Sequence, residues 1–257
     1  MPRLREHPFE TGEIAINYAE GGAVDGPPLV LLHGLAARWQ AFGPLLPALS
    51  LDWHLYAPDF RGHGASGKAP GHYGLPDYVR DTLAFLRAKV EPPAVLYGHS
   101  LGGWVGAVIA AEHPEMVRAL IIGDSALWTE SLDPDMSISY LTDLPIALRS
   151  LAKSLTQLDP DALAAFRDGR LVADYDPDRL LPKITCPVLL LQGNPARGSL
   201  MTDTDAARAL TILPDARHRR FDDLGHGLHV ENAEPILAAV SEFLGGLRTQ
   251  DSGLRTQ

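Results

Sequence analysis

The sequence predicts an α/β fold: a mostly parallel, twisted sheet covered by helices on both faces, with a small helical cap. Three observations lead to this expectation. Short apolar runs recur along the 257 residues, helix-like stretches separate them, and most runs end at a glycine or another turn residue. Strands that alternate with helices form βαβ units, whose parallel sheet is buried on both sides. The length suits one domain with an insertion.

The expected strands are near-continuous apolar runs of the length typical of buried strands. They span residues 29–32, 53–57, 94–97, 119–122, 188–191 and, more weakly, 217–221. Between them, amphipathic or small-residue stretches predict helices over residues 77–88, 101–112 and 235–244. Pro114 follows the second of these helices and Pro235 opens the third, as helix boundaries favour.

One long segment lacks convincing strands. Residues 128–182 contain helix-like stretches at 146–158 and 161–166, so we expect a helical cap there. It would lie over the carboxyl ends of the strands, where open α/β sheets bind ligands. The core domain is then formed by residues 1–127 and 183–245. Residues 246–257 hold a direct repeat of Gly-Leu-Arg-Thr-Gln and are expected to form a flexible tail.

Charge and composition exclude several classes of partner. The 22 Lys and Arg residues are outnumbered by 32 Asp and Glu, for a formal net charge of −10. Such an acidic chain argues against nucleic acid and anionic membranes as partners. No signal peptide or membrane-spanning apolar stretch is visible, so a cytoplasmic location is expected. The single cysteine, Cys186, excludes an internal disulfide and is expected to lie in the core. These patterns specify no oligomeric state.

The most informative segment, residues 95–104, reads as strand, Gly-x-Ser-x-Gly, helix. Gly98 and Gly102 flank Ser100 because a sharp turn brings backbone close and leaves no room for a Cβ. Ser100 then lies at a helix start, where free N–H groups and the helix dipole favour an oxyanion. This context predicts that Ser100 is a nucleophile and that the N–H of Leu101 is one donor of an oxyanion hole.

At this point the chain resembles the α/β-hydrolase superfamily in four motifs that follow the expected order. They are His-Gly-Leu-Ala at 33–36, Pro-Asp-Phe-Arg-Gly-His-Gly-Ala-Ser at 58–66, Gly-His-Ser-Leu-Gly-Gly at 98–103 and Leu-Gly-His-Gly-Leu-His-Val-Glu at 224–231. The resemblance spans nearly the whole chain. It implies that the N–H of Leu35 is the second oxyanion donor. It also implies that Asp59 and Arg61 hold loops together rather than contact substrate.

His226 is the expected general base. It lies between two glycines in a loop after the last expected strand, and the order serine then histidine suits this fold. With His229 it forms a His-x-x-His spacing that would be a weak metal pattern. No cluster of carboxylates or further histidines supports a metal site. We therefore expect neither a metal nor a cofactor.

The acid that completes a catalytic triad is left open. In many relatives it follows the strand that corresponds to residues 188–191, yet residues 193–198 contain no carboxylate. Asp124, at the end of the preceding expected strand, could reach the same imidazole and is favoured. Asp203 and Asp205 are the alternatives, although both are well placed to cap a following helix.

These residues predict a serine hydrolase that cleaves small carboxylic esters through an acyl-enzyme, a carboxylesterase. Serine at position 100 argues against haloalkane dehalogenases and epoxide hydrolases, which need a carboxylate there. Large aromatic residues flank the expected site, either as core residues or as walls of an apolar substrate pocket. They are Trp39, Phe42, Trp104 and Trp128.

Other functions of this fold stay open. A lactonase or a thioesterase would use the same residues. An aminopeptidase would need an acidic pocket for a free amine, for which Glu130, Asp133 and Asp135 of the cap are candidates. A non-catalytic receptor for a small molecule is a further alternative, because the acid is missing from its usual place. Covalent labelling by a fluorophosphonate distinguishes an active serine from a passive binder.

Overall fold

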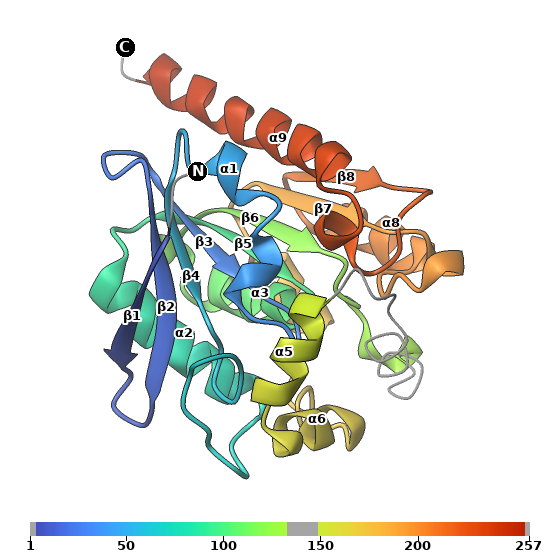
Figure 1. Cartoon of the computed structure of the whole chain (residues 1–257). Helices are drawn as coiled ribbons and strands as arrows, with labels where there is room; N and C mark the ends of the chain where they lie inside the picture. The colour runs from blue at the N-terminus through green and yellow to red at the C-terminus, as the bar shows by residue number, and fades with distance from the viewer. Residues whose placement is uncertain (1–3, 133–148, 255–257) are drawn as a thin grey trace.

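A computed structural model describes residues 4–132 and 149–254. In these residues, eight strands form one sheet in the order β1-β2-β4-β3-β5-β6-β7-β8 (Figure 1). The strands are β1 (Arg5–Glu10), β2 (Ala15–Gly22), β3 (Pro28–Leu32), β4 (His54–Pro58), β5 (Ala94–His99), β6 (Val117–Gly123), β7 (Val188–Gln192) and β8 (Ala216–Arg220). β2 pairs antiparallel with both β1 and β4, and the other pairs are parallel. The predicted fold class is confirmed.

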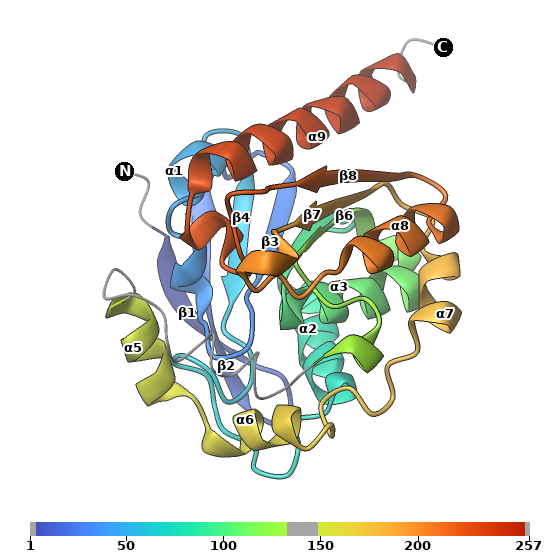
Figure 2. The same cartoon turned by 90° about the vertical axis from the view of Figure 1, so that its right-hand side faces the viewer.

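Helices cover both faces of the sheet (Figure 2). The helices α2 (Leu75–Lys89), α3 (Leu101–Glu112) and α8 (Asp203–Ile212) pack on one face. The helices α1 (Leu46–Leu49) and α9 (Ala233–Leu254) pack on the other. No helix in the described part of the chain is both long and apolar enough to cross a membrane.

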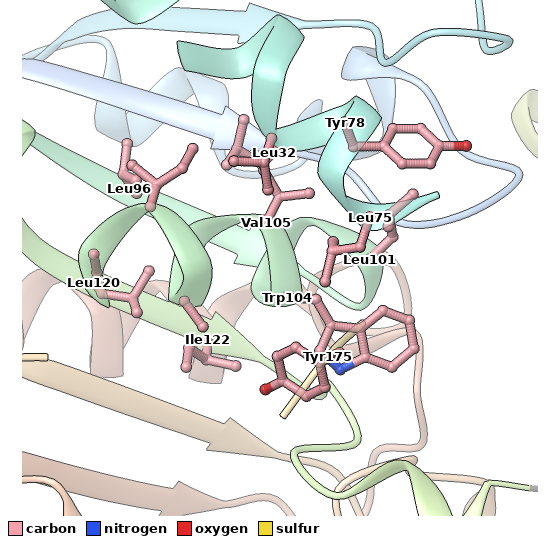
Figure 3. Packing of buried hydrophobic residues seen from close by; sticks show 14 of the residues in the cluster. Leu32, Leu75, Tyr78, Leu96, Leu101, Trp104, Val105, Leu120, Ile122 and Tyr175 are labelled. Atoms are coloured by element: carbon pink, nitrogen blue, oxygen red, sulfur yellow. The ribbon is translucent and has the colours of Figure 1, made fainter. Parts of the chain in front are cut away.

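Each face of the sheet buries its own apolar cluster. In β5, Val95 and Tyr97 face α1 and α9, whereas Leu96 faces α3. This alternation is the two-residue period of a strand. Figure 3 shows the cluster on the α3 side, where Leu32 and Leu96 of neighbouring strands lie close to Val105. Because the central strands are covered on both faces, most of their residues form continuous apolar runs, which made them predictable.

The described part of the segment between β6 and β7 consists of helices joined by turns and loops. It contains α5 (Arg149–Gln157), α6 (Pro160–Arg167) and α7 (Pro177–Leu180), and no strand lies in the described part of residues 128–182. The start of the helix expected over 146–158 falls outside the described residues. Backbone hydrogen bonds tie the helical part of this segment to the core. The N–H of Asp159 donates to the carbonyl of Gly62 at 2.7 Å, and the N–H of Leu75 donates to the carbonyl of Leu171 at 2.7 Å.

The carboxyl-terminal helix differs from the expectation of a flexible tail from residue 246. α9 continues to Leu254. Leu247 is buried beside Phe243 and Leu244 in the cluster under α9. The apolar face of the helix therefore extends into the repeated segment and holds its first turn against the core.

One edge of the sheet is formed by β8, which pairs with β7 alone. The residues of β8 are mostly exposed and mostly basic, in the order Ala-Arg-His-Arg-Arg. Arg219 forms an ion pair with Glu242 of α9 at 2.9 Å. This outer strand contributes little to the core, which explains its weak apolar signal in the sequence.

Candidate active site

Ser100 occupies a tight turn between β5 and α3. Its backbone has φ 53° and ψ −117°, a conformation that non-glycine residues adopt rarely and that tends to occur at functional sites. A Cβ at Gly98 would lie 2.1 Å from the carbonyl oxygen of Gly102, and one at Gly102 would lie 2.0 Å from that of Leu32. The flanking glycines are therefore required by close backbone contact, as the sequence motif predicts.

The loop after β3 brings Leu35 to the same place. The ring of the buried His33 holds this loop, because its Nδ1–H donates to the carbonyl of Gly34 at 2.8 Å and its Nε2 accepts the N–H of Phe60 at 3.0 Å. Burial lowers the pKa of His33 to about 4, so the ring stays neutral. Leu35 and Leu101 both line a pocket with Ser100, and Leu101 opens α3, where backbone N–H groups have no acceptor within the helix.

Asp124 and His226 form a close pair. Nδ1 of His226 lies 2.7 Å from Oδ2 of Asp124. Asp124 follows β6 directly and is fully buried. Burial alone would raise the pKa of this carboxyl, but the hydrogen bond and charge of His226, with further donors, hold the pKa below its ordinary value. The carboxylate is therefore ionised beside the imidazole.

The further donors to Asp124 come from the loop after β7. The N–H of Gly193 donates to Oδ1 at 3.0 Å and the N–H of Leu200 to Oδ2 at 2.8 Å. The hydroxyl of Ser199 donates to Oδ1 through a short hydrogen bond. This loop, which lacks the usual carboxylate, instead supplies hydrogen-bond donors to a carboxylate on the neighbouring strand. Sequence reasoning missed these contacts.

The alternative acids do not contact His226. Asp203 accepts a hydrogen bond from Gln192 at 2.8 Å and faces Arg220 at 3.4 Å. Thr202 is the N-cap residue of α8, and Asp205 forms the reciprocal pair of hydrogen bonds of a capping box with it. Both aspartates therefore lie in the first turn of α8, as expected, although neither is itself the N-cap residue.

The pocket beside Ser100 and His226 is small, about 20 Å³, and has apolar walls. The other lining residues are Leu35, Leu101, Trp104, Phe166, Leu171 and Leu200. Phe166 and Leu171 come from the segment between β6 and β7. The indole N–H of Trp104 donates to the carbonyl of Ala126 at 2.7 Å, which fixes the ring beside Tyr175 (Figure 3).

The other aromatic residues expected near the site have structural contacts. Phe42 stacks on His229 with ring centroids 4.9 Å apart. The indole N–H of Trp39 donates to Glu6 at 2.7 Å, and the guanidinium of Arg208 lies over the ring of Trp128. Of the four, only Trp104 is among the described residues that line the pocket.

Hydrogen bonds connect the segment 58–66 to neighbouring parts of the fold. Asp59 accepts the N–H of Trp39 at 2.8 Å and that of Ala65 at 3.1 Å. The buried Arg61 forms two hydrogen bonds with Asp81, at 2.7 and 2.8 Å. These contacts join loops, in line with the structural role that the resemblance implies.

Metal ligands are a separate question. In residues 4–132 and 149–254, no group of three or more His, Cys, Asp or Glu side chains could hold a metal ion. Asp133 and Asp135, which an acidic amine pocket would need, lie outside the described residues. Glu130 is exposed.

Residues 27–175 match the family model described as the alpha/beta hydrolase fold. The chain belongs to this family. The 2-(acetamidomethylene)succinate hydrolase of Mesorhizobium japonicum is 35% identical to this alpha/beta hydrolase over 91% of the chain and 93% of the relative. The pimeloyl-[acyl-carrier protein] methyl ester esterase of Xanthomonas oryzae is 27% identical over 86% and 96%.

A solved structure supports the same family. The crystal structure of a hydrolase from Pseudomonas aeruginosa PA01 matches this alpha/beta hydrolase with a TM-score of 0.79 and 25% identity, over 94% of this chain and 98% of that one. The superfamily resemblance of the four motifs is therefore confirmed.

Proposed function

We propose that this alpha/beta hydrolase is a serine hydrolase that cleaves small carboxylic esters through an acyl-enzyme. The observation that carries the proposal is the 2.7 Å contact between Nδ1 of His226 and Oδ2 of Asp124, next to a pocket that Ser100 and His226 share. A carboxylate that accepts the Nδ1–H leaves Nε2 as the proton acceptor of the ring.

In the first half of the reaction, Oγ of Ser100 attacks the carbonyl carbon of the ester while Nε2 of His226 takes the hydroxyl proton. The electron pair of the C=O bond moves to oxygen, where the N–H groups of Leu35 and Leu101 stabilise it. Each such donor contributes about 3 kcal/mol. Asp124 stabilises the imidazolium. The oxyanion collapses, the alcohol leaves with the proton from His226, and the acyl group remains on Ser100.

Water completes the cycle. His226 takes a proton from a water molecule, which attacks the acyl carbon and passes through the same oxyanion. The acid is released and Ser100 recovers its proton from His226. The reaction needs no cofactor, and its substrates are a small-molecule ester and water.

The lining of the pocket suits an apolar acyl group, and its narrowness favours a short one. Among the described residues, leucine, phenylalanine and tryptophan side chains leave about 20 Å³, little more than one water molecule needs, so a longer acyl chain would have to displace more of them. The likeness to a methyl ester esterase supports an ester as the substrate.

The test is hydrolysis of p-nitrophenyl esters from acetate to dodecanoate. We expect the highest kcat/KM with acetate and butyrate, and loss of turnover in Ser100→Ala. Ser241→Ala is a matched control, because Ser241 is exposed on α9. A fluorophosphonate should label the wild type and Ser241→Ala but not Ser100→Ala. Equal activity of Ser100→Ala and wild type would refute the proposal.

Assays with further substrates distinguish the other functions that are possible for this fold. Lactones and thioesters pass through the same acyl-enzyme, so faster turnover of either reassigns the substrate class but not the residues. Turnover of amino-acid amides alone would indicate an aminopeptidase. A chain that hydrolyses none of these substrates and is not labelled by the fluorophosphonate would favour the alternative of a small-molecule receptor.

A further inference from the structure

We propose that Glu231 and His99 are positioning residues that fix the backbone of His226 from two sides. The inference rests on the proposed role of His226 as general base. Neither residue lies between His226 and Asp124. Both act on the peptide groups that carry the imidazole.

Glu231 binds the backbone on either side of His226. Its Oε2 accepts the N–H of Gly225 at 2.9 Å, and its Oε1 accepts the N–H of Gly227 at 2.9 Å. The single turn Leu228–Val230 folds the chain back and makes this contact possible. One carboxylate therefore binds the residue before His226 and the residue after it. Because the acceptor is charged, these hydrogen bonds are stronger than those between neutral groups.

Close packing explains the glycines around His226. A Cβ at Gly227 would lie 2.8 Å from Oε1 of Glu231, so a side chain there would displace the carboxylate. A Cβ at Gly225 would lie 2.2 Å from the carbonyl oxygen of Arg197, and 3.2 Å from Oε1 of Glu231. A loop with two glycines has high conformational freedom of its own, so an anchor is needed to hold His226 in one place.

His99 holds the remaining backbone group. Its Nε2–H donates to the carbonyl oxygen of His226 at 2.8 Å, and the two rings lie 4.8 Å apart. His99 ends β5 and precedes Ser100 directly. The hydrogen bond therefore joins the loop of the base to the strand that carries the nucleophile.

The protonation state of His99 suits this role. Burial, and then the charge of His226, lower the pKa of His99 to about 4. The ring is neutral at neutral pH, with its proton on Nε2, because a carbonyl can only accept. It adds no positive charge next to the imidazolium that forms during the reaction.

A displaced base is costly, because a misplacement of about 1 Å in an active site lowers the rate by about 10²-fold. Glu231→Gln keeps the size of the side chain but leaves one acceptor oxygen for two N–H groups. We expect kcat to fall about 10- to 100-fold, by the same reasoning, with KM and Tm little changed. Glu234→Gln is the matched control, because Glu234 is exposed near the start of α9 and loses the same charge.

His99 is tested by rescue. His99→Phe keeps a ring without the donor and should lower kcat as Glu231→Gln does. His99→Gln restores an N–H donor at a similar reach and should recover most of the activity. A role in stability alone would lower Tm in each variant and would not separate phenylalanine from glutamine.

A readout besides activity is the far-downfield proton NMR signal of the His226 Nδ1–H that is bound to Asp124. We expect this signal to be sharp in the wild type and Glu234→Gln and broadened in Glu231→Gln and His99→Phe. Unchanged kcat and an unchanged signal in both variants would overturn the inference. If Ser100→Ala retains activity, the proposed function fails, and the signal still decides whether His226 is held in this way.

Discussion

Asp124 Oδ2 and His226 Nδ1 meet at 2.7 Å although the two residues are 102 positions apart in the chain. Asp124 follows β6, and the next strand in the sheet is β7. Because neighbouring parallel strands end at the same edge of a sheet, an acid after either strand can reach the imidazole. In this chain the β6 position carries the carboxylate and the loop after β7 carries its donors.

Asp124→Asn should nearly abolish activity. The amide can neither fix the required tautomer of His226 nor stabilise its cation, and a loss on the order of 10⁴ in kcat is expected. Asp203→Asn and Asp205→Asn should stay within a few-fold of the wild type, since neither carboxylate contacts His226. Steady-state kinetics of the three variants test which carboxylate acts with His226. An equal loss of kcat in Asp203→Asn would contradict the assignment of this role to Asp124.

Gly98→Ala should prevent correct folding around Ser100, because its Cβ would lie 2.1 Å from the backbone oxygen of Gly102. Circular dichroism and fluorophosphonate labelling would measure the loss. Gly245→Ala is the control: this glycine lies in α9, and a Cβ added there would meet no atom within 4 Å. In a helix the change should stabilise by up to about 1 kcal/mol. A folded, labelled Gly98→Ala protein would disprove the steric explanation.

Stability should fall on mild acidification. Burial lowers the pKa of His33 to about 4 and that of His63 to about 3, from 6.5. Between these values and 6.5 the unfolded chain binds more protons than the folded one. The stabilisation is therefore complete above pH 6.5 and is lost as the pH falls toward 4, by about 1.4 kcal/mol per pH unit for each proton.

Urea unfolding at about pH 7 and about pH 5 measures this slope. His63→Asn is the informative variant. Its amide can keep the hydrogen bond that the Nδ1–H of His63 donates to the carbonyl of Arg61 at 2.8 Å, but it cannot be protonated. Its slope should be shallower than that of the wild type, and parallel slopes would show that His63 does not contribute.

Asp81→Asn should destabilise the fold strongly. It leaves the buried guanidinium of Arg61 without its main counter-charge, and breaking a buried pair costs roughly 3–5 kcal/mol. Glu13→Gln removes a second partner of Arg61, at 2.9 Å, but Glu13 is 40% exposed, so a loss below about 1 kcal/mol is expected. Urea unfolding of both variants gives the comparison, and equal losses would contradict the role of burial.

The central strands could be predicted from sequence because burial on both faces requires continuous apolar runs, as in Leu29 to Leu32. The two amino-terminal strands could not. β1 (Arg5–Glu10) alternates exposed and partly buried residues, and its charged ends resemble a loop. β1 joins the sheet through β2, and β2 pairs with β4, which lies far along the chain. The extent of α9 was missed because a repeated polar segment gave no sign that Leu247 would be buried.

Parts of the candidate site were also predictable from the sequence and parts were not. The tight turn at Ser100 could be predicted because its constraints are local and each requires a glycine. The choice among Asp124, Asp203 and Asp205 stayed open because it depends on which strand ends face His226. The contacts of Glu231 and Ser199 could not be predicted. Glu231 accepts backbone N–H groups, which every residue except proline carries, and the contact of Ser199 depends on the conformation of the loop after β7.

The basic edge strand β8 has a consequence for behaviour at high concentration. An open strand offers unpaired backbone groups to any other strand, including the same edge of a second molecule, and proteins commonly block this with charge. Arg217, Arg219 and Arg220 on one β8 would face the same residues on another. Replacing these arginines by uncharged β-branched residues would remove that repulsion and create a nucleus for aggregation at a strand that does not line the pocket of Ser100.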